Sequence, residues 1–266
     1  MSKKKDIPKF ANDLIETHCH LDYLKELSTE EILKKCEDHN IKKIVTIAVD
    51  SGNLESVRNL ASSFDQVFGT QGIHPHHANE YSETVEKEIR NHINDKHIVA
   101  VGEIGLDFYY NNSKKEEQIP AFEKQLQIAV DTNKPVVIHT READEDTIAI
   151  LKNFSKTLKG NGVIHSFTSS VSLAEFCLDE GFYLGFNGII TFKNAQNVRD
   201  VLAVTPIEQT LIETDSPFLT PVPFRGRENA PFYLPFVAEK IASEKEMNIE
   251  DVLKITKNNA INLFKL

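Results

Sequence analysis

Short apolar runs rich in valine and isoleucine recur about every 30 residues along this chain, with helical patterns between them. The eight runs are residues 14–18, 43–49, 67–73, 98–103, 135–139, 163–165, 183–186 and 210–213. Strands that alternate with helices predict a parallel sheet, and eight such units in a chain of this length predict a closed (β/α)8 TIM barrel. We expect one domain over residues 1–266, with about residues 1–12 as a flexible N-terminal tail. The runner-up is an open doubly wound sheet, which normally shows a GxGxxG turn after its first strand, and none follows here.

Capping and turn residues mark the segments between the runs. A capping box at Ser28–Glu31 predicts a helix over 32–39, and residues 172–175 form a second possible box. Apolar residues at helical spacing predict a helix over 116–130. The proline-rich stretch 217–235 reads as a long loop after the last strand, and 235–266 reads as helical and packed against the outside.

Composition excludes several classes of protein. The chain carries a net charge of −10, which argues against broad, sequence-independent wrapping of nucleic acid because that activity normally leaves a basic footprint. Cys19, Cys36 and Cys177 lie far apart without a CxxC pair, so we expect a reduced, cytoplasmic chain. We expect no secretory signal, since no apolar segment follows the lysines near the start, and the sequence has no apolar run long enough to span a membrane. It does not determine the oligomeric state, although a monomer is favoured.

Histidines gather where the predicted strands end, and in such a barrel the active site lies at the carboxyl ends of the strands. Of the ten histidines, seven are at such ends: His18, His20, His74, His76, His77, His139 and His165. A single histidine there is more often a hydrogen-bonded structural residue. Burying so many titratable groups in one layer is costly without metal or pairing, so the set predicts a metal site.

The ligands divide between two divalent ions. The first ion would be bound by His18, His20 and Asp215. The second would be bound by His139 and His165, and Glu103 from the strand between would bridge both ions with its two oxygens. Two ions bridged in this way lie about 3.5–4 Å apart and lower the pKa of a shared water until hydroxide exists near neutral pH. Mixed histidine and carboxylate ligands suit Zn, Mn, Fe or Co, and Mg more weakly.

Two carboxylates are candidates for further catalytic roles. Asp215 is predicted to accept the proton of the water as well as to bind metal. Glu213, two residues earlier, faces the same barrel interior. It would either hold a metal ligand in place, act as an alternative base, or be a buried carboxylate paired with a lysine or arginine, and the residues alone do not decide between these.

Substrate contacts are predicted on two loops. Arg225 and Arg227 follow the eighth strand, where barrels often bind phosphate, and arginine offers a planar fork for phosphate oxygens. His74 and His76 are candidates for substrate contact near the metals, and each could equally be a structural loop residue. Lys193, at the mouth after the seventh strand, is a weaker candidate.

At this point the motifs resemble those of the TatD family of metal-dependent deoxyribonucleases. The resemblance covers roughly residues 14–264 in order, through the segments 16–22, 72–76, 102–107, 135–141, 162–167, 213–217 and 225–229. It implies a TIM barrel of the amidohydrolase-like class and divalent metals (Mg, Mn or Zn) on the same six ligands. It also implies hydrolysis of DNA phosphodiester bonds, as an enzyme acting on ester bonds and often as an exonuclease that works from the 3′ end. The partner would be DNA, at ends or in single strands.

Three departures from the family pattern bear on the substrate. Glu16 stands where the family usually has aspartate, residues 166–169 read Ser-Phe-Thr-Ser in place of Cys-Phe-Ser-Gly, and the usual arginine shortly after Asp107 is missing. None removes a predicted ligand. Two alternatives stay open: a hydrolase of amides, lactones or phosphotriesters, and a non-catalytic metal-binding protein. Many of the former bridge their metals with a modified lysine where this chain has Glu103, which favours the phosphodiesterase.

Overall fold

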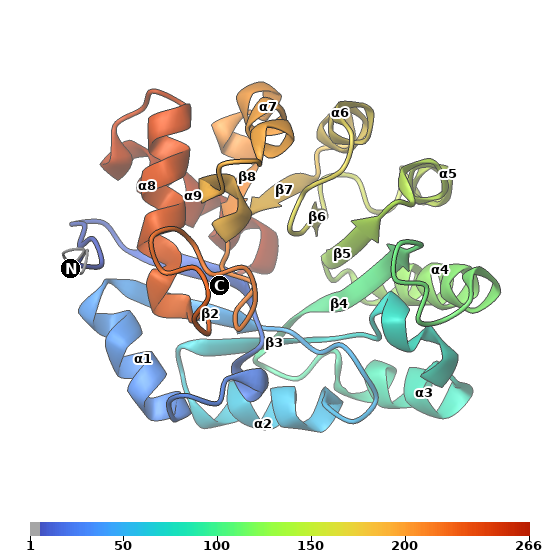
Figure 1. Ribbon diagram of the computed structural model, residues 1–266. Coiled ribbons are helices and arrows are strands. Elements are labelled where there is room, and N and C mark those ends of the chain that lie inside the picture. The colour runs from blue at the N-terminus through green and yellow to red at the C-terminus, as the bar shows by residue number, and fades with distance from the viewer. Residues whose placement is uncertain (1–5) are drawn as a thin grey trace.

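Eight parallel strands form the centre of the computed structural model, which describes residues 6–266 (Figure 1). They are β1 (Leu14–Cys19), β2 (Ile41–Thr46), β3 (Val67–Gln71), β4 (Ile98–Asp107), β5 (Val136–Arg141), β6 (Gly162–Ile164), β7 (Tyr183–Phe186) and β8 (Thr210–Ile212). Each strand pairs in parallel with the next in the chain, in the order β1 to β8. The TIM-barrel prediction is confirmed, and all eight apolar runs are strands.

The ring closes between β8 and β1 through a short set of hydrogen bonds. Asp215 N donates to His18 O at 2.9 Å, and His20 N donates to Ser216 O at 2.8 Å. Lower in the seam, the Thr17 hydroxyl donates to Ile212 O at 2.9 Å. These bonds join the backbone just beyond the strand ends, so the barrel is nearly closed and its last seam passes directly through predicted metal ligands.

Helices surround the strands on the outside (Figure 1). They are α1 (Thr29–Asp38), α2 (Leu54–Ser63), α3 (Glu83–His92), α4 (Lys115–Thr132), α5 (Asp144–Phe154), α6 (Val171–Asp179), α7 (Gln196–Val204), α8 (Leu234–Glu244) and α9 (Ile249–Phe264). The capping box of Ser28 and Glu31 opens α1 as predicted. The second predicted box is wrong, because Ser170 rather than Ser172 caps α6 and accepts from Leu173 N.

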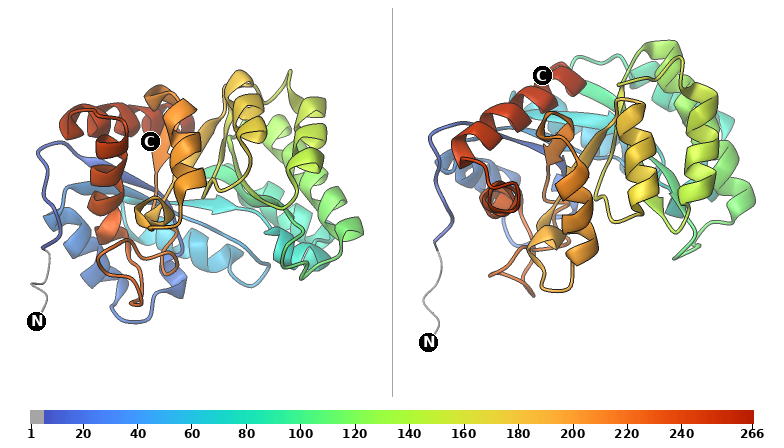
Figure 2. Two further views of the ribbon diagram at one scale, coloured as in Figure 1. Left: turned by 45° about the horizontal axis from the view of Figure 1, so that its top comes forward. Right: turned by 90° about the horizontal axis from the view of Figure 1, so that it is seen from above.

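A compact apolar cluster fills the amino-terminal end of the barrel. It contains Ile15, Val99 and Val163 near the starts of their strands, together with Leu263 and Phe264 from the end of α9. Burial of a large aliphatic side chain is worth about 1.5–3 kcal/mol, so this cluster anchors α9 firmly. Residues 235–266 are mostly helical, as predicted, and the end of α9 lies across the amino-terminal end of the barrel. In the left view of Figure 2, α9 and the β8–α8 loop lie at opposite ends of the barrel.

The chain before β1 is irregular but attached. Residues 1–5 of the expected tail lie outside the described residues. From residue 6 to β1 there is no helix or strand, yet Ala11 N and Asn12 N each donate to the Glu250 carboxylate at 2.9 Å, and the Asn40 side chain donates to Phe10 O. These bonds anchor residues 10–12 to α9 and to the turn before β2.

Within residues 6–266, no helix combines the length and the apolar character that crossing a membrane requires.

Candidate metal centre

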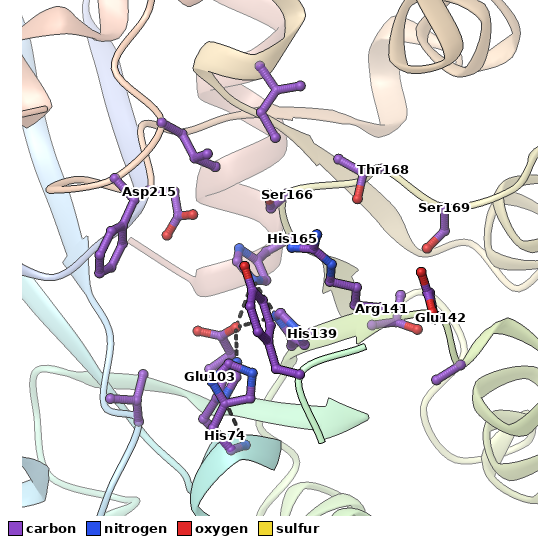
Figure 3. Close-up of a pocket in the computed structure, with 18 of the residues that line it drawn as sticks. His74, Glu103, His139, Arg141, Glu142, His165, Ser166, Thr168, Ser169 and Asp215 are labelled. Atoms are coloured by element: carbon purple, nitrogen blue, oxygen red, sulfur yellow. Dashed lines mark hydrogen bonds and ion pairs between the residues drawn. The ribbon is translucent and has the colours of Figure 1, made fainter. Parts of the chain in front are cut away.

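The carboxyl ends of the strands bring all six predicted ligands together. In Figure 3, Glu103, His139, His165 and Asp215 point toward one space. Ligand atoms of His18, His20 and Asp215 lie within 4.8 Å of one another, as do those of His18, Glu103 and His165. The two groups share His18, and His139 adjoins them through Glu103, so the six predicted ligands form one continuous centre.

Glu103 lies in the middle of the centre and divides its two oxygens between opposite walls. Its Oε1 is 2.7 Å from His165 Nε2 and 3.1 Å from His139 Nδ1, while its Oε2 is 3.4 Å from His18 Nε2. Burial raises the pKa of the Glu103 carboxyl, but the neighbouring His165 and His74 more than offset this and hold the pKa well below its usual range. Glu103 is therefore an ionised carboxylate with one oxygen for each half of the centre. One half contains His18, His20 and Asp215 at β1 and β8, and the other contains His139 and His165 at β5 and β6.

Asp215 completes the β1–β8 half of the centre, which it enters from the seam between these two strands. Its Oδ1 is 3.5 Å from His20 Nε2 and 3.7 Å from His18 Nε2. Burial raises the pKa of Asp215, but the hydrogen bond from His20 and the nearby His18 lower it overall. Asp215 has a φ of 56°, in the left-handed region that aspartate tolerates better than most residues. Such a conformation persists where surrounding structure holds it, as at functional sites.

Orphaned ring nitrogens test whether this centre fits a metal. Both nitrogens of the fully buried His18 and Nδ1 of His165 have no hydrogen-bond partner within residues 6–266. A buried polar atom without a partner costs about 1–3 kcal/mol. Burial holds the pKa of His18 below its usual value, so His18 is neutral and presents a lone pair rather than a charge. Burial lowers the pKa of His20, His139 and His165, but the facing carboxylates more than offset this and raise it. A cation bound among these groups would replace the protons that the carboxylates attract, and mixed histidine and carboxylate donors suit a transition metal, so the residues fit a divalent cation.

Hydrogen bonds to the far ring nitrogens set which atom each histidine offers. His20 Nδ1 donates to Ile47 O at 3.3 Å, which leaves Nε2 for the centre. His139 Nε2 donates to Asp107 Oδ2 at 3.0 Å, which leaves Nδ1. Carbonyl or carboxylate partners of this kind orient metal-binding histidines and raise their basicity.

Asp107 is a residue whose role our sequence analysis missed. Besides His139, its Oδ2 accepts from His76 Nε2 at 2.9 Å, and its Oδ1 accepts from the backbone of Tyr109 and Tyr110. Burial raises the pKa of Asp107, but the hydrogen bonds from His139 and His76 more than offset this and lower it far below its usual range. Asp107 therefore ties a metal-facing histidine to the loop after β4. Its position at a strand end was the available signal.

His74 touches the centre without offering it a lone pair. The cluster of His74, Glu103 and His139 has the spacing of a metal site. However, His74 Nδ1 accepts from His76 N at 3.0 Å, so the proton of the neutral ring must be on Nε2, which lies 3.3 Å from Glu103 Oε1. Burial lowers the pKa of His74 to about 3, which keeps the ring neutral. His74 thus donates to Glu103 and orients it.

Two further carboxylates lie behind the ligands. Glu16, fully buried, accepts through Oε1 from His18 N at 3.0 Å and from Thr214 N at 2.9 Å, so it bridges the β1–β8 seam beside His18 and Asp215. Burial raises the pKa of the Glu16 carboxyl well above its usual value. Its departure from the family pattern was the only sequence signal for this role.

Glu213 supports His165 from the side away from the centre. Its Oε1 accepts from Ser166 N at 2.6 Å and lies 3.7 Å from His165 Nδ1. A side chain at Gly185 would collide with the Glu213 carboxylate, so β7 leaves room for it. Glu213 does not line the cavity around the centre, and no lysine or arginine within residues 6–266 pairs with it. This position suits support of His165 better than the role of an alternative base.

A cavity of about 1180 Å³ opens from the centre, and one wall of it is acidic. The start of α5 and the residues before it line this wall with Glu142, Asp144, Glu145 and Asp146. Arg141 lies there too, with its guanidinium 4.2 Å from the ring centre of Tyr109 and 4.9 Å from that of Tyr110. The loop that lacks the usual arginine is therefore met by an arginine from β5, which sequence analysis did not single out.

The remaining predicted substrate residues divide into two groups. His74 and His76 line the cavity at the metal centre, and their contact with substrate stays a prediction. Arg225 and Arg227 do not line the cavity, so their predicted contact with a phosphate, which stays a prediction, would lie away from the metal centre. Arg225 lies 3.8 Å from the ring centre of Phe192, and Arg227 lies 5.5 Å from that of Phe224. The β8–α8 loop is long enough to carry both away from the centre.

Known proteins with similar sequences and structures share this architecture. An uncharacterized metal-dependent hydrolase, YabD, from Bacillus subtilis is 37% identical and is matched over 95% of this chain and 99% of its own length. The 3′-5′ ssDNA/RNA exonuclease TatD of Pantoea ananatis is 32% identical, over 89% and 93% of the two chains. The crystal structure of YJJV, a TatD homologue from Escherichia coli, is 28% identical and superposes with a TM-score of 0.89 over 95% and 98%.

More distant structures show the fold alone. A mutant organophosphorus hydrolase superposes with a TM-score of 0.67 at 12% identity, over 94% and 92% of the two chains. The family model described as TatD related DNase matches residues 15–265. This match includes every residue of the metal centre and all of the strands except the first residue of β1, and the chain therefore belongs to the TatD family.

Proposed function

We propose that this chain is a metal-dependent hydrolase that cleaves phosphodiester bonds in DNA, at single-stranded 3′ ends, with two divalent ions. The observation that carries the proposal is the position of Glu103, whose Oε2 faces His18 while its Oε1 faces His139 and His165. An ionised carboxylate in that position is what a bridged pair of cations requires. Ions bound there would neutralise phosphate charge and lower the pKa of a shared water.

The side chains of the chain have separate tasks in this reaction. Asp215, whose carboxylate borders the cavity, accepts the proton of the attacking water. His74 donates a hydrogen bond from Nε2 to Glu103 and keeps the carboxylate oriented between the two halves of the centre. Asp107 and Glu16 hold His139 and His18 in place. These contacts exist before substrate binds, so little reorganisation is needed during reaction.

Aromatic side chains near the centre favour a nucleic acid over an amide or lactone. Tyr109 and Tyr110 are about half exposed, and Arg141 packs on both rings at the edge of the cavity. Rings and guanidinium planes of this kind stack on unpaired bases, each worth about 1–3 kcal/mol. A relative named as a 3′-5′ ssDNA/RNA exonuclease supports the same direction of cleavage.

A single-stranded oligonucleotide labelled at its 5′ end tests the proposal. The purified chain is incubated with Mg, Mn or Zn, or with chelator, and products are resolved by length. We expect a ladder that shortens one nucleotide at a time from the 3′ end, with no cleavage in chelator and recovery when metal is restored.

Two controls separate the alternatives. Panels of amide, lactone and phosphotriester substrates are run with the same metals. Turnover of one of these with intact DNA would indicate the amidohydrolase-type alternative. Tight metal binding without turnover on any substrate would indicate a metal-binding protein, and cleavage that persists in chelator would contradict metal dependence.

A further inference from the structure

A second, smaller pocket adjoins the cavity of the metal centre. It has a volume of about 260 Å³, and Thr168 and Ile189 line both spaces. Its other walls come from the β7–α7 connection and from the β8–α8 loop, the two loops that most often bind phosphate in TIM barrels. The candidate active site therefore extends into a second, adjoining pocket.

The charge of this second pocket is opposite to that of the acidic wall. Lys193 and Arg225 line it together with Asn194 and Asn197, and no aspartate or glutamate does so among the described residues. Neither cation forms an ion pair within 4 Å in residues 6–266. In a chain with a net charge of −10, two unpaired cations in one concave site are unusual and favour an anionic ligand.

The walls of the second pocket are fixed before any ligand arrives. The Arg199 guanidinium donates to Ile190 O, Phe192 O and Lys193 O, which holds the backbone that carries Lys193. Val222 N donates to the Thr191 hydroxyl at 2.9 Å and ties the β8–α8 loop to the same turn. The Phe192 ring supports the Arg225 guanidinium at 3.8 Å. A pre-formed site of this kind loses less conformational entropy on binding.

We propose that the second pocket is a phosphate subsite, which holds a phosphodiester of the substrate other than the one that is cleaved. This inference rests on the proposed DNA function. A terminal base can stack at Tyr110 and Arg141, but the acidic start of α5 beside them disfavours further phosphates there, so the remaining chain of nucleotides runs toward Lys193 and Arg225. The pocket therefore selects a polynucleotide over a compound with a single phosphate.

Paired substrates test the subsite. Arg225→Gln and Lys193→Gln are assayed on a single-stranded oligonucleotide and on bis(4-nitrophenyl) phosphate, which has one phosphate. Each variant should lose about 10-fold more in kcat/KM on the oligonucleotide than on the small ester, mainly through KM, because it removes one charge-assisted hydrogen bond to a phosphate. The slope of log KM against log salt should fall by roughly 1 per cation removed.

Lys42→Gln is the matched control, since this exposed lysine lies at the start of β2, at the other end of the barrel. It should leave both rates and the salt slope unchanged. Equal losses on the two substrates, or an unchanged KM for the oligonucleotide in both pocket variants, would overturn the subsite.

A titration without turnover distinguishes failure of the subsite from failure of the DNA function. Inorganic phosphate is added to the metal-free chain in chelator, and binding is followed by calorimetry. Wild type should bind phosphate, and a double Lys193→Gln, Arg225→Gln variant of unchanged unfolding midpoint should not. Absent binding in wild type, or equal binding in the double variant, rejects the subsite; absent DNA cleavage with intact phosphate binding rejects the proposed function alone.

Discussion

The two halves of the metal centre are held by different kinds of structure. Toward β1 and β8, His18 and Asp215 are positioned by backbone hydrogen bonds across the seam, with the Glu16 carboxylate joining the two strands. Toward β5 and β6, ring nitrogens are oriented by carboxylates: Asp107 holds His139, and Glu213 lies behind His165. The first half thus depends on closure of the barrel, whereas the second depends on individual side chains. Substitutions of the groups that support the β1–β8 half should therefore mainly reduce the stability of the fold, and substitutions of those that support the β5–β6 half should mainly weaken metal binding.

The halves also differ in exposure. The His18 side chain is 1% exposed, whereas that of His139 is 19% exposed and borders the cavity. An ion in the β5–β6 half is therefore more accessible to solvent and to substrate. We expect it to exchange faster than an ion in the β1–β8 half.

The largest effect should come from Glu103→Gln, which removes the charge that both halves share. The amide can still accept a hydrogen bond, but it cannot bridge two cations as a carboxylate does. We expect at least about a 100-fold loss of DNA cleavage, the order seen when one stabilising group leaves a reaction centre, measured as initial rate on the labelled oligonucleotide. Glu37→Gln, on the exposed face of α1 and outside the cavity, is the control. Near-normal turnover in Glu103→Gln would remove the basis of the assignment.

Single histidine variants should divide the two halves. His20→Ala removes a ligand of the β1–β8 half, and His139→Ala removes one of the β5–β6 half. Each variant should retain one tightly bound ion and lose the other, as counted by elemental analysis after gel filtration. If either variant lost both ions or kept both, the division into halves would be incorrect.

A smaller and one-sided effect is expected from Asp107→Asn. The amide can present its nitrogen to His139 and disturb the ring orientation that leaves Nδ1 for the centre. Loss of such a partner typically costs about 10–100-fold in metal affinity or activity. Metal titration should show weaker binding of the ion in the β5–β6 half and unchanged binding of the ion in the β1–β8 half. Equal weakening of both ions would show that Asp107 acts through the fold and not through His139.

Glu16→Ala should mainly reduce stability. It leaves His18 N and Thr214 N buried without their acceptor, which costs about 1–3 kcal/mol per group. Urea unfolding of the metal-free chain measures the loss. Glu16→Gln, which keeps an acceptor oxygen, is the matched variant and should lie close to wild type. A Glu16→Ala chain as stable as wild type would mean that the seam does not depend on this carboxylate.

Prediction from the sequence succeeded for features that depend on a single strand or helix and on the position of a residue within it. Apolar runs located all eight strands, and the position of His18, Glu103 and Asp215 at strand ends was enough to bring them together in a barrel. It failed where the outcome depends on which side chains meet across elements. Nothing local indicates that Asp107 reaches His139, or that His74 uses its lone pair on His76. Likewise, the β8–α8 loop is so long that its sequence does not indicate the packing of Arg225 on Phe192.

Manganese bound to the wild-type chain tests the bridged centre most directly. The metal-free protein is titrated with Mn²⁺, and the bound ions are counted and examined by electron paramagnetic resonance. The account predicts two ions per chain with spin coupling between them, and loss of that coupling in Glu103→Gln. A single bound ion, or two uncoupled ions that are indifferent to Glu103→Gln, would contradict it.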